Sequence, residues 1–174
     1  MRFPSIVHAS PLFCLFFVSA CGARKPATTA NGATTTTTAS GGVRHVVVAA
    51  NQPVTLVGAY KAGQTVDLEP KGGTWSAGGG RPVVGAEGQP NALCLGDGAH
   101  HCIGGDALAP WMSLVVLMTP CPIEQQGCFV FGRDPISAAV TITVPRDGYM
   151  YLAPNDWMEE VGDNTGAISV DVSP

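Results

Sequence analysis

The chain contains 174 residues, among them 22 Gly and 14 Pro, the two residues that most strongly interrupt regular structure. This composition argues against long helices. Charged residues make up only 13% of the sequence and the formal net charge is −4, so the chain has no basic stripe with which to neutralise nucleic-acid phosphates. The hydrophobic content of 45% is ordinary for a globular domain, and the length predicts one hydrophobic core.

Residues 1–20 have the order of charged, apolar and small residues that is typical of a secretion signal. Arg2 precedes the apolar run 11–18, and two small residues come before Cys21. The run is shorter than the roughly 20 apolar residues that a membrane-spanning helix needs, so we expect a signal peptide that is cleaved after export.

The segment Val18-Ser19-Ala20-Cys21 resembles a bacterial lipobox. The resemblance implies that Cys21 becomes the lipidated first residue of the mature protein, with a diacylglyceryl thioether and an amino terminus acylated by a palmitate-type chain. Two or three such chains would hold the protein at a membrane. Gly22 stands where an inner-membrane retention signal has Asp, which favours the outer membrane or the cell surface. An ordinary signal peptide with cleavage nearby is the alternative.

Residues 21–42 are predicted to be the lipidated Cys followed by a flexible tether. The tether holds seven Thr together with Ala, Gly and Ser, and no aromatic or large aliphatic residue. Such a segment buries too little apolar area to offset the entropy of ordering it. A bare linker and an O-glycosylated stalk both fit this composition.

Residues 43–174 are predicted to form an all-β domain. Short runs of β-branched residues recur between turn signals, and several alternate with polar residues at the period of two that a half-buried strand shows. Short strands at this spacing predict a small antiparallel β-sandwich of jelly-roll-like type. The predicted turns are 71–73, 76–80 and 146–148. The predicted strands are 46–50, 54–59, 65–69, 111–118, 128–131, 138–144, 149–152 and 167–172.

Four cysteines follow Cys21, an even number in a chain that we expect to reach an oxidising compartment. We favour the local disulfides Cys94–Cys102 and Cys121–Cys128, each of which closes a short loop. The alternative for the first pair is a zinc site that adds His100 and His101. Neighbouring side chains of an extended chain point to opposite faces, so three adjacent ligands would converge poorly on one tetrahedral ion.

Residues 155–166 form the densest polar cluster of the chain and lie between two predicted strands. The cluster contains Asp156, Glu159, Glu160 and Asp163. Calcium takes about six to eight oxygen ligands, which a glycine-punctuated loop can supply from carboxylates, amides and backbone carbonyls. The spacing does not match an EF-hand, and a solvated turn without metal is the alternative interpretation.

The order of several motifs resembles that of the calcium-dependent galactose-binding lectins of the PA-IL (LecA) type. The segment 71–75, Lys-Gly-Gly-Thr-Trp, precedes a small-residue loop. Asn155-Asp156 precedes the segment 162–166, Gly-Asp-Asn-Thr-Gly, and an alternating terminal strand. The similarity extends over roughly residues 46–172. It implies a small antiparallel β-sandwich that holds a calcium ion at one end.

The resemblance also implies which residues form the site. The family's side-chain ligands fall here on Asp156, Asp163 and Asn164, and its carbonyl ligands on Gly78 and Glu160. A sugar supplies two vicinal hydroxyls as further ligands of the ion, which is a hard cation that prefers oxygen. The implied carbohydrate-binding residues are Gln89, Asn91, Asp156, Asp163 and Asn164.

Two departures from the family concern the sugar. The family's sugar-contacting loop has His-Pro followed by Gln, whereas this chain has Gln89-Pro90-Asn91, so the glycan is left open between a galactose-like sugar and another. Gly78 stands where the family has Tyr, which keeps the backbone carbonyl and loses the ring. Trp157 either stacks on a sugar face or packs beneath the loop.

We therefore expect a surface-anchored, calcium-dependent carbohydrate-binding module. The alternative is a structural or assembly β-sandwich of the same fold that binds no sugar. We expect no enzyme activity: Asp156 with Glu159 and Glu160 could be imagined as a glycosidase pair, but the chain has no Gly-x-Ser-x-Gly elbow and no phosphate-binding Gly loop. The oligomeric state is left open.

Overall fold

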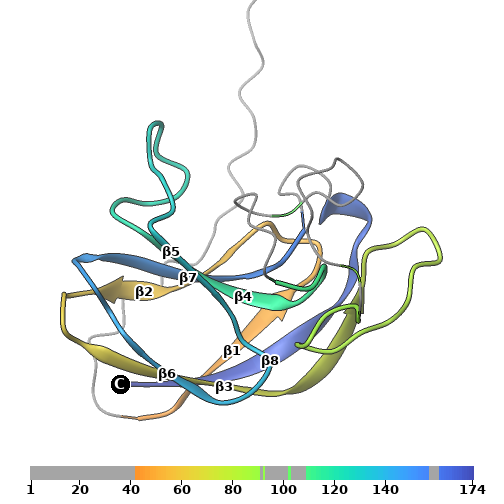
Figure 1. The fold of residues 1–174 in the computed structure, drawn as a ribbon, viewed down its shortest axis with the longest axis horizontal. Coiled ribbons are helices and arrows are strands. Elements are labelled where there is room, and N and C mark those ends of the chain that lie inside the picture. The colour runs from red at the N-terminus through yellow and green to blue at the C-terminus, as the bar shows by residue number, and fades with distance from the viewer. Residues whose placement is uncertain (1–41, 91, 93–101, 103–108, 157–160) are drawn as a thin grey trace, which may run out of the picture. The chain divides into compact units, whose positions relative to one another are not determined.

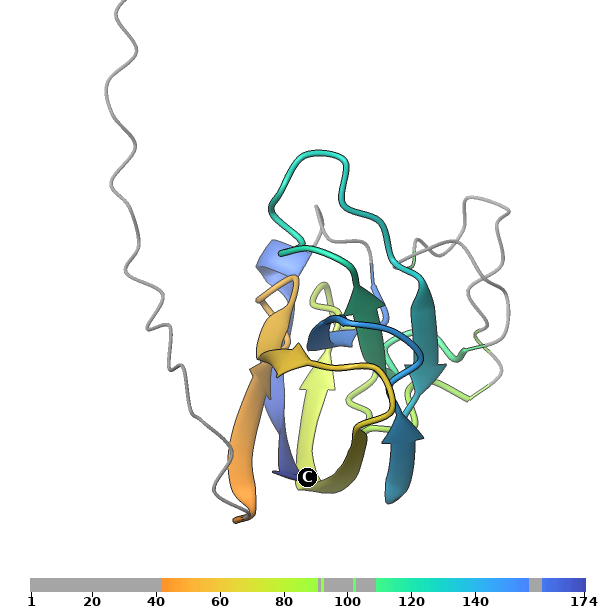
Figure 2. The same cartoon turned by 90° about the vertical axis from the view of Figure 1, so that its left-hand side faces the viewer.

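Two four-stranded antiparallel sheets face each other in the computed structural model, as Figures 1 and 2 show from two directions. The structure describes residues 42–90, 92, 102, 109–156 and 161–174, all within the unit Thr36–Pro174. The predicted signal peptide, Cys21 and the tether up to residue 41 lie outside the described residues. The prediction of an all-β sandwich is confirmed.

The first sheet has the order β1-β8-β3-β6 and the second the order β2-β7-β4-β5. A single 3-10 turn, η1 (Val161–Asp163), precedes β8 in the described part of the chain. The strands of the first sheet are β1 (Arg44–Ala49), β8 (Thr165–Ser173), β3 (Thr65–Ser76) and β6 (Val140–Thr143). The strands of the second sheet are β2 (Thr55–Tyr60), β7 (Gly148–Pro154), β4 (Leu114–Thr119) and β5 (Gly132–Pro135).

The main core lies between the two sheets and follows the alternation of the sequence. Val66 and Leu68 of β3 are buried while Asp67 and Glu69 between and beyond them are exposed. Each buried aliphatic side chain of this kind contributes about 1.5–3 kcal/mol relative to an exposed one. Fully buried aliphatic residues of the core come from both sheets and include Val48, Val66, Leu68, Ile168, Val170, Val57, Leu114, Val116 and Leu152.

β4 is buried on both of its faces, so its sequence is an uninterrupted apolar run without alternation. A second cluster of Val115, Leu117 and Tyr151 lies on the outer face of the second sheet. The loop between β4 and β5 covers this face, since Ile123 and Val130 pack against the cluster.

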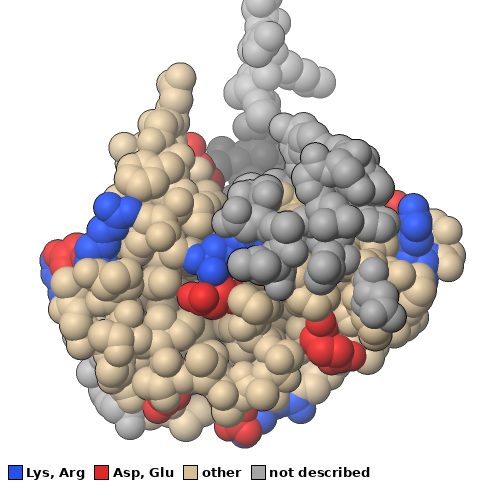
Figure 3. Space-filling model, viewed as in Figure 1, with Lys and Arg blue, Asp and Glu red and all other residues tan. Residues whose placement is uncertain are grey.

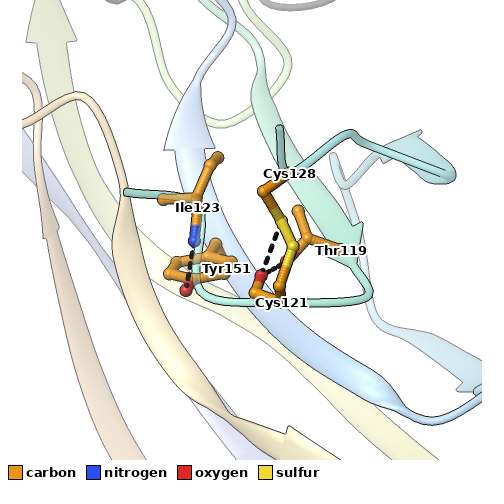
Figure 4. The surroundings of a disulfide bond; sticks show 5 residues. All are labelled: Thr119, Cys121, Ile123, Cys128 and Tyr151. Atoms are coloured by element: carbon orange, nitrogen blue, oxygen red, sulfur yellow. Dashed lines mark hydrogen bonds between the residues drawn. A yellow bond between two sulfur atoms is a disulfide. The ribbon is translucent and has the colours of Figure 1, made fainter. Parts of the chain in front are cut away.

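The predicted disulfide Cys121–Cys128 is present in that covering loop, and its Cα atoms are 5.7 Å apart (Figure 4). Two hydrogen bonds join the loop to its surroundings. The Ile123 N–H donates to the Tyr151 hydroxyl at 3.1 Å, and the Thr119 hydroxyl donates to the Cys121 carbonyl at 2.6 Å. The disulfide thus closes a loop that shields the outer face of β4.

The predictions for residues 71–73 and 128–131 were wrong, and residues 111–113 precede the strand in which they were predicted. Residues 71–73 are no turn: β3 continues through them to Ser76, with a register shift between Pro70 and Gly72. Positive φ angles of 132° at Gly72 and 101° at Gly73 allow this bulge, and at Gly73 a Cβ would lie 2.2 Å from the Ala167 carbonyl oxygen of β8.

The predicted strand 128–131 is the second error. The observed β5 begins only at Gly132, because residues up to Cys128 are held in the disulfide-closed loop. The Phe131 N–H nevertheless donates to the Met118 carbonyl at 2.9 Å, which brings the chain into register for β5. Within the described residues, no helix has the length and apolar character required to cross a membrane.

Segments of two connections, β3–β4 and β7–β8, meet at one end of the sandwich. β3 ends at Ser76 opposite Thr165, where β8 begins, and β7 ends at Pro154 opposite Leu114, where β4 begins. The segments that follow or precede these pairs, 77–92, 109–113 and 155–164, are therefore neighbours at the right-hand end of Figure 1, as far as the structure describes them. We call this the loop end.

Candidate ligand-binding site

Backbone hydrogen bonds hold the three segments of the loop end together. The Gln89 N–H donates to the Trp111 carbonyl at 2.8 Å, and the Met112 N–H donates to the Asn155 carbonyl at 3.0 Å. The indole N–H of Trp75, at the end of β3, donates to the Met112 carbonyl at 2.7 Å. Residues 111–112 are thus the central piece, with a neighbouring segment on each side.

Asp156 places a carboxylate in the interior of the loop end, where its residue is only 5% exposed. Its Oδ1 accepts a hydrogen bond from Trp111 Nε1 at 3.1 Å, and its Oδ2 accepts one from Asn164 Nδ2 at 2.9 Å. A buried carboxylate is costly unless donors or a cation compensate it. The two N–H groups provide part of that compensation and fix the orientation of the carboxylate.

Asn164 is buried beside Asp156, and its amide nitrogen is well supplied with acceptors. Besides Asp156, Nδ2 donates to the Ala50 carbonyl at 3.3 Å and lies 4.0 Å from the Met112 sulfur. Its Oδ1 is buried and has no hydrogen-bond partner among the residues that the structure describes. A buried amide oxygen in this situation calls for an explanation, and a bound water or cation is the usual one.

Gly78 and Asp163 are in direct contact. A Cβ on Gly78 would lie 2.6 Å from both the backbone oxygen and Oδ2 of Asp163, and the φ angle of Gly78 is +70°. A side chain at position 78 is therefore disfavoured both by the backbone conformation and by the contact. The Gly78 carbonyl accepts a hydrogen bond from the Arg81 N–H at 2.9 Å and still has a second lone pair.

The structure therefore brings four of the five predicted metal ligands to the loop end. Asn164 contacts Asp156, and the preceding residue, Asp163, contacts Gly78. Asp156 and Asn164 are buried, whereas Asp163 is exposed. The fifth, Glu160, lies outside the described residues.

The residues predicted to contact carbohydrate are described only in part. Gln89 is half-buried, and its backbone joins the site through Trp111 and Ala92. Asn91 and Trp157 lie outside the described residues, so neither interpretation of Trp157 is tested.

Cys102 is the described cysteine that lies near the site, and it has no free thiol. Cys102 is disulfide-bonded, and its sulfur lies 3.5 Å from the Asn155 carbonyl oxygen. A disulfide sulfur cannot serve as the thiolate that the alternative zinc site requires. The predicted partner Cys94, together with His100 and His101, lies outside the described residues.

Sequence reasoning missed three residues of the loop end. Trp111 and Met112 were expected inside a strand, yet both precede β4. Trp111 donates to Asp156, and the guanidinium carbon of Arg81 lies 5.3 Å from the centre of the Trp111 ring. Met112 has a positive φ of 58°, which is uncommon for a residue with a side chain. No spacing in the sequence indicated these contacts.

The donor set suits a hard cation better than a transition metal. In the described part of the chain, no group of three or more His, Cys, Asp or Glu side chains is arranged to hold a metal ion. The oxygens present are two carboxylates, one amide oxygen and backbone carbonyls. Calcium accepts such mixed oxygen ligands, while zinc favours nitrogen and sulfur.

The chain is similar to solved structures but matches no sequence family. No family model matches the chain, and no curated protein matches it by sequence. A solved chain described as "EclA N-terminal domain; PllA-like lectin" is 20% identical, over 74% of this chain and 93% of that chain, with a TM-score of 0.48. Its description does not single out the PA-IL type, and at this identity and TM-score the similarity identifies neither a ligand nor site residues here.

Proposed function

We propose that the domain binds carbohydrate at the loop end through a calcium ion. The observation that carries the proposal is the buried Asn164 Oδ1, which has no partner in the described structure and belongs to a side chain fixed against the Asp156 carboxylate. Asp163 precedes Asn164 in the chain, and Gly78 lies against Asp163.

The residues that would hold the ion are Asp156, Asp163, Asn164 and the Gly78 carbonyl. A bound calcium ion supplies open coordination positions that two adjacent sugar hydroxyls can fill in place of water. The protein's own residues position these ligand oxygens. Trp111 and Asn164 orient the Asp156 carboxylate, and the contact between Gly78 and Asp163 keeps the loops that follow β3 and precede β8 together.

Asp163 offers the sharpest test, because its side chain is exposed and its loss leaves no buried donor without an acceptor. We expect calcium to raise the melting temperature of the full chain and Asp163→Ala to abolish that rise. At 100 times its dissociation constant a bound ion stabilises by about 2.7 kcal/mol, which a melting curve resolves.

Two controls keep this result specific. Asp163→Asn retains a side-chain oxygen and should retain a calcium response, while Asp134→Asn removes a similar exposed charge from β5 and should change nothing. An equal response in Asp163→Ala and the parent chain would overturn the metal assignment.

Carbohydrate binding is tested separately on a glycan array, with calcium and with a chelator. We expect retention of at least one glycan that the chelator and Asp163→Ala both eliminate. A chain that responds to calcium but retains no glycan would be the structural module that is the alternative to a lectin.

We further propose that Cys21 carries a lipid that holds the exported protein at an outer membrane or cell surface, with residues 22–42 as the tether. The support is the Val18-Ser19-Ala20-Cys21 segment. Cys21→Ser should move the protein from the membrane fraction to the soluble fraction, and a variant that stays with the membrane would contradict the proposal.

A further inference from the structure

We propose that Arg81 makes the site selective for glycans that carry a carboxylate, such as those containing uronic-acid residues. This inference rests on the proposed carbohydrate binding and adds the chemical class of the ligand. It is drawn from the position of one arginine and from the groups that face it.

Hydrogen bonds hold both the backbone N–H and the backbone carbonyl of Arg81 at the loop end. Its N–H donates to the Gly78 carbonyl at 2.9 Å, and its carbonyl accepts a hydrogen bond from the Ser76 hydroxyl at 3.0 Å. Its guanidinium lies over the ring of Trp111, at 5.3 Å from the ring centre. The same indole donates to Asp156, so Trp111 contacts both the guanidinium and one of the proposed ligand carboxylates.

The charge of Arg81 is not used elsewhere in the described structure. The side chain is exposed and forms no ion pair with any described residue. On the face shown in Figure 3, charged side chains occur singly or in small groups of opposite sign rather than in a broad patch. Electrostatic selection on this face therefore depends on individual side chains.

A guanidinium above an aromatic ring keeps N–H donors that the ring does not use. Those donors match a carboxylate, which they bind in a bidentate, charge-assisted manner, whereas a neutral hydroxyl gains much less from them. The carboxylates of Asp156 and Asp163 repel an anionic glycan, so its binding depends on the calcium ion and on Arg81. A neutral glycan needs no such compensation.

The experiment compares neutral and acidic ligands that share hydroxyl geometry. The full chain in calcium is screened on an array that pairs neutral glycans with their uronic-acid counterparts, with D-galactose, D-galacturonate and its methyl ester as soluble competitors. We expect a preference for the acid of about tenfold at low salt, reduced by added salt. Arg81→Gln should lose this preference while it retains the calcium-dependent rise in melting temperature.

Arg146→Gln is the matched control. Arg146 also lies over aromatic rings, at 3.8 Å from the centre of Phe131 and 5.3 Å from that of Phe129, but it precedes β7 at the end away from Asp156. This variant should keep the preference for acidic ligands.

The outcomes separate the two proposals. A parent chain that binds no glycan overturns carbohydrate binding and the selectivity with it. Equal binding of neutral and acidic ligands by the parent chain overturns the selectivity alone. The same holds if Arg81→Gln weakens both ligand classes to the same extent, because Arg81 would then support the site without choosing the ligand.

Discussion

Two buried tryptophans differ in what their indole N–H groups bind. Trp75 belongs to the core between the sheets, is 1% exposed and donates to the neutral Met112 carbonyl. Trp111 belongs to the loop end, is 7% exposed and donates to the Asp156 carboxylate. Both groups are satisfied, as buried indoles usually are. The partner is backbone in the first case and an ionisable side chain in the second.

The difference separates packing from ligand chemistry. Trp75 packs in the apolar core cluster, which Trp111 also joins, and a backbone carbonyl satisfies its indole N–H. Around Trp111 the fold holds a buried carboxylate and a buried amide oxygen, which packing alone does not require. Substitutions in the first region should therefore change stability, and substitutions in the second should change the response to calcium and glycans.

The largest expected effect comes from Trp75. Trp75→Ala removes the largest fully buried side chain among the described residues and should lower the free energy of unfolding by about 3–5 kcal/mol, measured by urea denaturation. Trp75→Phe, which keeps most of the ring, serves as the control for volume. A loss below about 1 kcal/mol in Trp75→Ala would break the comparison, because Trp75 would then not be a core residue.

A second prediction compares alanine substitutions at Gly78 and Gly79, where β3 leads into the loop end. Both have positive φ angles, 70° and 54°, but a Cβ meets Asp163 only at Gly78 and open space at Gly79. Gly79→Ala should cost about 1 kcal/mol for the backbone conformation, and Gly78→Ala about 2–3 kcal/mol because the contact adds to it.

The calcium response distinguishes these variants further. Gly78→Ala should weaken calcium binding because it displaces Asp163, and Gly79→Ala should not. Equal effects of the two substitutions on melting temperature in calcium and in chelator would mean that the contact with Asp163 has no consequence.

The sequence predicted the core much better than the loop end. Alternation such as Val66 and Leu68, or Ile168 and Val170, reports burial directly because side chains of a strand point to opposite faces in turn. The bulge at Gly72 and Gly73 escaped prediction, since a glycine pair signals a turn and a bulge alike.

At the loop end, the local pattern predicted a polar cluster over residues 155–166, and the family resemblance implied Asp156, Asp163 and Asn164 within it. The contributions of Trp111 and Arg81 were not predicted, because both reach the site from distant segments through tertiary contacts. A propensity pattern placed Trp111 in a strand, whereas its contacts with Asp156, Gln89 and Arg81 assign it to the loop end. Sequence motifs report residues close in the chain more reliably than residues brought together by the fold.

A third prediction tests Trp111 itself. Trp111→Phe keeps an aromatic ring beneath Arg81 and removes the donor to Asp156, so it should cost about 1.5–2 kcal/mol for a charge-assisted hydrogen bond. Titration calorimetry should show weaker calcium binding than in the parent chain. Unchanged affinity would mean that Trp111 supports stability in the same way as Trp75, and the two regions would not differ.

The smallest expected effect lies at the turns away from the loop end. The Asp147 carboxylate accepts hydrogen bonds from Lys61 Nζ at 2.8 Å and from the Ala62 N–H at 2.9 Å. The hydrogen bond from the Lys61 ammonium is the main cause that lowers the pKa of Asp147 below its ordinary value of 3.8. The hydrogen bond from the Ala62 N–H lowers it further. Because the folded pKa is the lower one, the stabilisation is complete above the unfolded pKa and is lost as the pH falls through the folded pKa.

Urea denaturation of the parent chain and of Asp147→Asn should therefore differ by a small, constant amount from neutral pH down to about pH 5, and the difference should shrink below about pH 4. Both side chains of the pair are largely exposed, so added salt should reduce the difference as well. Lys61→Met should lower the stability at neutral pH in the same direction, and neither variant should alter the calcium response of the loop end. A difference that grows on acidification would contradict the sign of the Asp147 shift, and a lost calcium response would mean that the two ends of the sandwich are coupled.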